Sequence, residues 1–135
     1  MFFSASIANT VSALNIAYKS NQKMLKLPLC KKNEAVLKKL LTLGLIQGLS
    51  IKKENNRRIV SIMLAYQYGR PVLKKIILIS TDSKKYTASI KSLQRFASLD
   101  ISTCYIISTS LGLLTEQEAF FKHIGGMLLL KYFLN

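Results

Sequence analysis

Acidic side chains are scarce in this chain of 135 residues: six Asp and Glu stand against twenty Lys and Arg, which gives a net charge of +14. Positive charges in this excess repel one another unless an anionic partner neutralises them. Nucleic acid is the commonest such partner, and an anionic membrane surface is the alternative. Half of the residues are hydrophobic, which excludes the disordered class and leaves enough apolar surface for a core.

The residues that build catalytic and metal sites are equally few. The one histidine, His123, has no second histidine or acid cluster beside it that would indicate acid–base chemistry. Cys30 and Cys104 lack the spacing of a metal site, so we expect two buried, reduced thiols. The sequence also lacks a phosphate-binding glycine loop. We therefore expect a binding protein, not an enzyme, with no metal and no cofactor.

Long apolar runs are missing as well, since none reaches the ~18 residues of a membrane-spanning helix. Residues 1–18 are rich in apolar side chains but carry no early basic residue, so they match neither a good signal peptide nor an Arg-rich presequence. Ile7, Val11, Leu14 and Tyr18 recur at helical spacing and predict a first helix over 6–18.

Periodicity and turn residues predict an α-β-α-β-β first lobe. Its further elements are a strand at 24–27, a helix at 31–43 and strands at 45–51 and 59–66. The second helix has an apolar face turned inward and a lysine face turned outward, formed by Ala35, Val36, Leu40 and Leu43 and by Lys31, Lys32, Lys38 and Lys39. Gly69-Arg70-Pro71 marks the predicted boundary between a lobe at 1–68 and a lobe at 72–135.

The predicted second lobe is mostly β with one or two short helices. A strand at 72–80 leads to a polar turn that ends in Lys84, Lys85 and Tyr86. A short helix at 89–99 and a strand at 101–108 follow. The fold class is therefore α+β.

A run of hydroxyl side chains follows that strand. Ser108, Thr109 and Ser110 precede Leu111 and Gly112, which is typical of a tight turn because Ser and Thr bond nearby backbone groups. Thr115 and Glu118 then form a capping box for a short helix whose apolar face is Ala119, Phe120, Phe121 and Ile124. The pair Gly125-Gly126 ends this helix before a last strand at 127–133.

Positive charge is concentrated in the first two-thirds of the chain. Eighteen of the twenty basic residues precede Phe96, and only Lys122 and Lys131 follow it. Long-range attraction therefore comes from the first two-thirds, and the hydroxyl turn acts by hydrogen bonding at close range. By itself a Ser-Thr-Ser run is more often an ordinary solvent turn, and Lys84-Lys85-Tyr86 by itself is a solvated loop.

The combination of these segments resembles a known family. Ile107-Ser108-Thr109-Ser110-x-Gly112, then Leu114-Thr115, a helix and Gly125-Gly126 before a closing strand, is similar to the C-terminal signature of small-subunit ribosomal protein eight. Further similar segments are Ile7-Ala8-Asn9, Leu27-Pro28 followed by Lys31, and Gly44-Leu45-Ile46. The chain departs from the family at Leu111, where a basic residue is usual, and at Ala13 and Asn15, where arginines are usual.

The resemblance implies a structural protein that binds the central domain of small-subunit ribosomal RNA and supports subunit assembly beside neighbouring ribosomal proteins. It implies close RNA contact by Ser108, Thr109 and Ser110, with Gly112 holding the turn. Phosphate contacts would come from Lys84, Lys85, Lys31 and Lys32, and stacking or packing from Tyr86. We also predict that Leu111 is partly exposed at an RNA or protein contact.

The divergence and the Lys, Ile, Leu and Asn bias fit an organellar protein, with the mitochondrion as first choice, a plastid as second and a eubacterial cytoplasm as third. We expect no membrane partner and no homo-oligomer. The alternative function is that of a basic peripheral membrane or scaffold protein without RNA specificity.

Overall fold

The computed structural model describes residues 3–80, 84–89, 91–92 and 103–135. The first half comprises α1 (Phe3–Lys19), β1 (Met24–Pro28), α2 (Lys31–Thr42), β2 (Ile46–Glu54) and β3 (Arg57–Leu64). The remainder comprises β4 (Tyr66–Gln67), β5 (Arg70–Pro71), β6 (Leu73–Leu78), β7 (Thr87–Ala88), β8 (Thr103–Thr109), β9 (Gly112–Thr115), α4 (Glu116–Phe121) and β10 (Gly126–Leu134). The α+β class is confirmed, while the helix predicted at 89–99 lies mostly outside the described residues.

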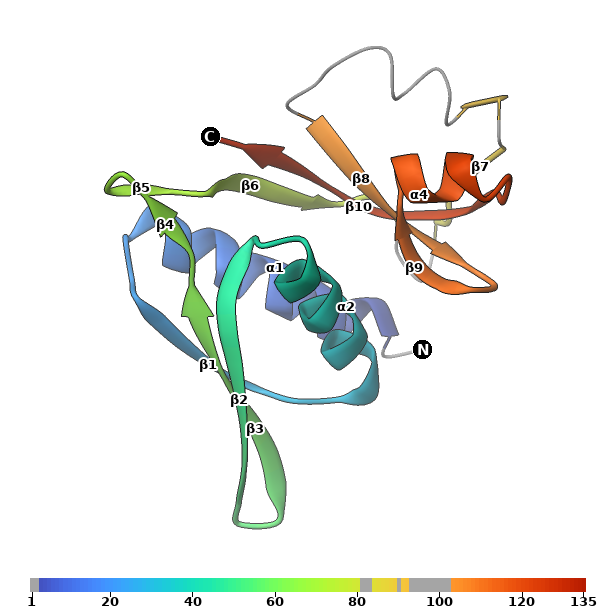
Figure 1. Cartoon of the computed structure of the whole chain (residues 1–135). Helices are drawn as coiled ribbons and strands as arrows, with labels where there is room; N and C mark the ends of the chain where they lie inside the picture. The colour runs from blue at the N-terminus through green and yellow to red at the C-terminus, as the bar shows by residue number, and fades with distance from the viewer. Residues whose placement is uncertain (1–2, 81–83, 90, 93–102) are drawn as a thin grey trace.

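The first sheet has the antiparallel order β1-β3-β2, and the helices α1 and α2 lie against it (Figure 1). The β2–β3 hairpin extends beyond the end of β1, because Pro28 is the last β1 residue that pairs with β3. Its turn residues Asn55 and Asn56 both have positive φ, 48° and 61°, as a type I′ turn requires.

The second sheet has the order β6-β10-β8-β9, and the short strand β7 also pairs with the start of β10. The long closing strand β10 is therefore central, with β6 and β7 along one edge and β8 along the other (Figure 1). The helix α4 follows β9 directly and packs against β8 and β9.

One large hydrophobic core joins the two halves of the chain. Ile7 and Leu14 of α1 and Leu37 of α2 are fully buried in the same cluster as Ile76 of β6 and Leu130 of β10. A smaller cluster under α4 contains Ala88, Ile107, Leu114, Ala119 and Leu128.

The Asn15 side chain fixes α1 to the open edge of the second sheet. Its Nδ2 donates to the carbonyl of Ile76 at 2.8 Å, and the Ile76 N–H donates to its Oδ1 at 2.9 Å. The amide thus satisfies both backbone groups that an edge strand leaves unpaired at this position. Asn15 therefore serves as a clamp between α1 and β6.

Four predictions about individual side chains are wrong. Lys39, predicted on the outward face of α2, has a side chain that is only 13% exposed, because it pairs with Glu118. Ala35 is exposed and Leu37 is fully buried, because the inward face of α2 follows the spacing 33, 36, 37 and 40. Phe121 is 85% exposed, since it lies two residues, roughly 200°, around α4 from the buried Ala119. Cys30 and Cys104 are free thiols as predicted, but both are only half-buried.

Candidate nucleic-acid interface

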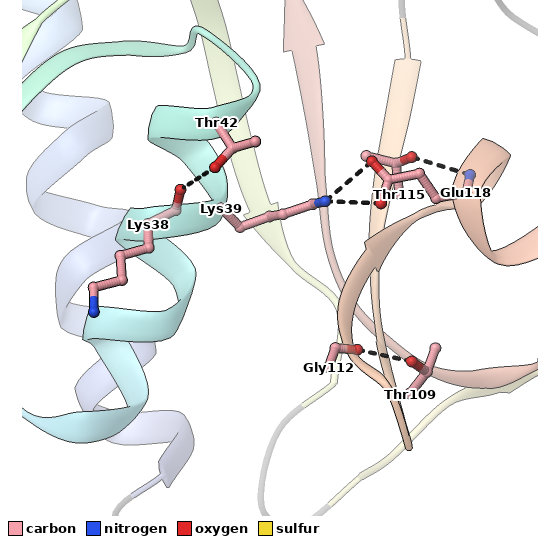
Figure 2. A network of polar contacts seen from close by, with 7 residues as sticks. All are labelled: Lys38, Lys39, Thr42, Thr109, Gly112, Thr115 and Glu118. Carbon is pink, nitrogen blue, oxygen red and sulfur yellow. Dashed lines mark hydrogen bonds and ion pairs between the residues drawn. The ribbon is translucent and has the colours of Figure 1, made fainter.

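The hydroxyl turn is a two-residue loop, Ser110-Leu111, between the paired residues Thr109 and Gly112. Gly112 has φ +109°, a conformation that side chains rarely adopt, so the turn depends on a glycine here. The Thr109 hydroxyl donates to the Gly112 carbonyl at 2.8 Å (Figure 2). It also accepts from the Leu111 N–H at 3.2 Å. Thr109 therefore organises the turn from within.

The other hydroxyls of the turn are available to an outside partner. Ser110 is exposed and Ser108 is half-buried, and within the described part of the chain neither side-chain oxygen has a hydrogen-bond partner. Leu111 is 61% exposed, which confirms its predicted exposure. The tip thus presents small polar groups and one apolar side chain.

The strand β10 connects β7, which follows Lys84-Lys85-Tyr86, with β8, which leads into this turn. Met127 of β10 pairs with Ser108 of β8 on one side and with Thr87 of β7 on the other. Two inter-strand spacings, roughly 10 Å, therefore separate Thr87 from Ser108. The two segments predicted to bind RNA, one before Thr87 and one after Ser108, therefore both belong to the second sheet.

The buried Ser80, 2% exposed, anchors the Tyr86 backbone. Its hydroxyl accepts from the Tyr86 N–H at 3.1 Å and donates to the Leu128 carbonyl, and the Leu128 N–H donates to the Tyr86 carbonyl at 2.8 Å. The Lys84 ammonium lies 5.5 Å from the centre of the Tyr86 ring, a cation–π contact. Sequence reasoning missed Ser80, because a serine at a strand end carries no signal that it is buried.

The pair Gly125-Gly126 allows β7 and β8 to approach β10. A Cβ on Gly125 would lie 2.6 Å from the Ala88 carbonyl oxygen, and one on Gly126 would lie 2.4 Å from the Ser108 carbonyl oxygen. The helix itself ends earlier, at Phe121, and it is His123 that adopts the positive φ of 56°. The glycine pair was expected to stop the helix, but the structure requires it for close backbone contact.

An ion pair joins the two helices beside the site. Lys39 Nζ of α2 lies 2.9 and 3.1 Å from the Glu118 carboxylate oxygens of α4 (Figure 2). Thr115 caps α4, because its hydroxyl accepts from the Glu118 N–H at 3.3 Å. The predicted capping box is only half formed, since the Glu118 carboxylate pairs with Lys39 rather than with the Thr115 N–H. The predicted phosphate ligands Lys31 and Lys32 lie at the other end of α2, roughly 12 Å along the helix from Lys39.

A second acid of α4 is buried behind β8. Glu116 is 5% exposed, and its Oε2 has no hydrogen-bond partner among the described residues. Burial raises the pKa of Glu116 to about 7, while a hydrogen bond from the Tyr105 backbone opposes this shift.

Other kinds of site find no support in the part of the chain that the structure describes. No group of three His, Cys, Asp or Glu residues there is arranged to hold a metal ion. None of the described helices has the length and apolar character needed to span a membrane.

Comparison with known proteins matches residues 5–133 to the family model of ribosomal protein S8. The chain is 32% identical over 125 residues to small ribosomal subunit protein uS8m of Acanthamoeba castellanii, covering 93% of this chain and 96% of that protein. It is 31% identical to uS8 of Nitrosomonas europaea, covering 91% and 92% of the two chains. Its identity to uS8 of Orientia tsutsugamushi is 30%, covering 98% and 100%.

Proposed function

The chain belongs to the ribosomal protein S8 family, a family of structural proteins rather than enzymes, and on this premise we propose that it binds the central domain of small-subunit ribosomal RNA and supports assembly of the subunit. The observation that supports the proposal is that Thr87, which directly follows Lys84-Lys85-Tyr86, and Ser108, which leads into the hydroxyl turn, pair with the same β10 residue, Met127. Its partners would be that RNA and neighbouring small-subunit proteins.

The chemistry of the turn suits the minor groove of an RNA stem. Double-stranded RNA presents 2′-hydroxyls and phosphates across a wide, shallow minor groove and is recognised mostly by shape. Ser110 and the backbone of Gly112 are small enough to approach this surface closely, and Thr109 holds them in place before binding. The lysines Lys84 and Lys85 supply phosphate contacts beside the groove.

The proposal is tested by titrating the full chain with a stem from the central domain of the RNA. Replacing Ser108 and Ser110 by alanine removes two hydrogen-bonding side chains, about 1–3 kcal/mol together, so affinity falls roughly 5- to 150-fold. The matched control is Ser12→Ala/Ser50→Ala, two exposed serines elsewhere in the chain.

A second variant separates charge from hydrogen bonding. Lys84→Ala/Lys85→Ala lowers the slope of log affinity against log salt by roughly one per lost phosphate contact. If all four substitutions together left stem affinity and its salt slope unchanged, the assignment of the site would be wrong.

The mitochondrion is the proposed compartment, supported by the similarity to a mitochondrial protein. The bacterial relatives at 31% and 30% identity support a bacterial ribosome to nearly the same degree. Sedimentation of the tagged chain in mitochondrial lysate tests whether it joins the small subunit there. Co-migration with the small subunit that is lost on RNase treatment supports the proposal, and migration with membranes supports the peripheral membrane alternative.

A further inference from the structure

The β4–β5 hairpin carries an aromatic side chain in an unusual state. Tyr68 and Gly69 form its two-residue loop, since Gln67 pairs with Arg70 across the hairpin. Tyr68 is 95% exposed and has φ +52°, a conformation that is rare for a bulky residue. The Tyr68 ring packs against no other part of the described chain, so both of its faces are available to a partner outside the chain.

The hairpin is held firmly at its base. The Tyr66 ring packs against Tyr18 with centroids 6.2 Å apart, and its hydroxyl donates to the Gln22 carbonyl. On the other side, Asn135 Nδ2 donates to the Pro71 carbonyl at 2.7 Å. Tyr68 is therefore presented from a rigid support, which reduces the entropy lost on binding.

Two adjoining grooves extend from the hairpin. The first, of about 520 Å³, is lined by Tyr68 and Arg70 together with Pro71 and Leu134. The second, of about 410 Å³, shares Pro71 with the first and is lined by Lys19, Lys74 and Lys75. The exposed Tyr68 ring therefore lies in the first groove, and four cationic side chains line the two grooves together.

A β-bulge contributes both neighbouring lysines to the second groove. Lys75 pairs with Phe133 and Leu73 pairs with Leu134, so Lys74 has no partner in the ladder. Consecutive side chains of a regular strand point to opposite faces, but here Lys74 and Lys75 are both exposed and line the same groove.

No carboxylate side chain lines either groove. The ion pairs found among the described residues use Lys38, Lys39 and Arg58, so the four groove cations are left without an acidic partner there. An aromatic platform beside a positively charged groove is the arrangement that binds single-stranded nucleic acid, with a base on the ring and phosphates along the cations.

We propose that this surface binds an unpaired RNA strand, with a base stacked on Tyr68 and the backbone phosphates held by Arg70, Lys74, Lys75 and Lys19. The inference rests on the proposed function, because it gives the same RNA-binding protein a second contact of different chemistry. The hydroxyl turn would recognise a paired stem, whereas this groove takes a strand whose bases are free to stack.

The test uses the full chain and a fluorescent twelve-nucleotide oligoadenylate, with affinity measured by anisotropy. Tyr68→Asn removes the ring and suits the left-handed backbone, so the fold is retained. Loss of one stacked base predicts affinity roughly 5- to 150-fold lower, while Tyr68→Phe retains wild-type affinity. Equal affinity of Tyr68→Asn and wild type would overturn the proposal.

The charged part of the site has a matched control. Lys74→Ala/Lys75→Ala is expected to lower the salt slope for the oligoadenylate by about 1.4, two contacts at roughly 0.7 each. Lys52→Ala/Lys53→Ala removes an equal pair of exposed lysines from β2 and is expected to change the slope little. An equal effect of both pairs, or displacement of the RNA by oligoglutamate at the same charge concentration, would show an unspecific anion surface or a site for an acidic protein and refute the proposal.

Parallel titration with the central-domain stem separates this inference from the proposed function. Tyr68→Asn is expected to bind the stem as wild type does. If the stem binds and Tyr68→Asn leaves oligoadenylate affinity intact, only the groove proposal fails. If the stem does not bind but oligoadenylate affinity still depends on Tyr68, the proposed function fails and the groove proposal stands.

Discussion

The sharpest consequence of the site geometry concerns Gly126, where β8 and β10 meet. In Gly126→Ala the new Cβ would lie 2.4 Å from the Ser108 carbonyl oxygen, and ordinary contact begins near 3.4 Å. The backbone must therefore move by about 1 Å, and the atom to be displaced belongs to the ladder rather than to a flexible side chain. We expect a loss of about 1–3 kcal/mol in the free energy of unfolding, the usual cost of overpacking.

The chain contains its own control, since Gly48 also lies within a strand. A Cβ there would meet only Met63 Sδ at 3.8 Å, so Gly48→Ala is expected to be neutral or stabilising by about 0.5–1 kcal/mol. Both variants are compared by urea unfolding followed by circular dichroism. Because Ser108 must shift in Gly126→Ala, its stem affinity falls even under conditions where it is fully folded. Unfolding midpoints that agree for the two alanine variants would refute the close-contact explanation of the glycine pair.

Three further predictions concern side chains around the site and the groove. A double-mutant cycle on Lys39 and Glu118 should give a coupling energy of about 1 kcal/mol that weakens in high salt, measured by urea unfolding. Burial raises the pKa of Glu116 from 4.5 to about 7, so the folded state holds a proton that the unfolded state has released between these values. Stability therefore falls as pH rises from about 4.5 to 7, by up to roughly 3 kcal/mol, and Glu116→Gln should abolish this slope. Tyr68→Asn should raise stability by about 1 kcal/mol in thermal unfolding, because asparagine tolerates the left-handed conformation better.

The sequence predicted the elements well because their signals are local. Apolar spacing located the first helix at 6–18, and α1 spans Phe3–Lys19. The hydroxyl run and its glycine predicted the β8–β9 turn, and the Thr115 cap located the start of α4. In each case neighbours within about four residues determine the conformation.

The contacts that assemble the site were not predictable in the same way. Asn15 and Ile76 are 61 residues apart, and a polar residue on an otherwise amphipathic helix does not indicate which strand it will clamp. The pairing of Met127 with both Ser108 and Thr87 likewise depends on sheet order, which periodicity leaves open. The role of Gly126 follows from that pairing, so it could not be predicted before the order of the strands was known.

The β8–β9 turn and the β4–β5 hairpin, which lie in separate sheets, would suit different kinds of RNA. At the β8–β9 turn Thr109 satisfies its own hydrogen bonds, so Ser110 is held in one position and a partner of fixed shape is favoured. At the β4–β5 hairpin Tyr68 offers a ring face, which accepts any base, beside long flexible lysines. If both proposals hold, an RNA stem that continues into an unpaired strand would contact both surfaces. RNA lacking either part should therefore bind more weakly than RNA containing both, because tethering the two contacts raises their effective concentration.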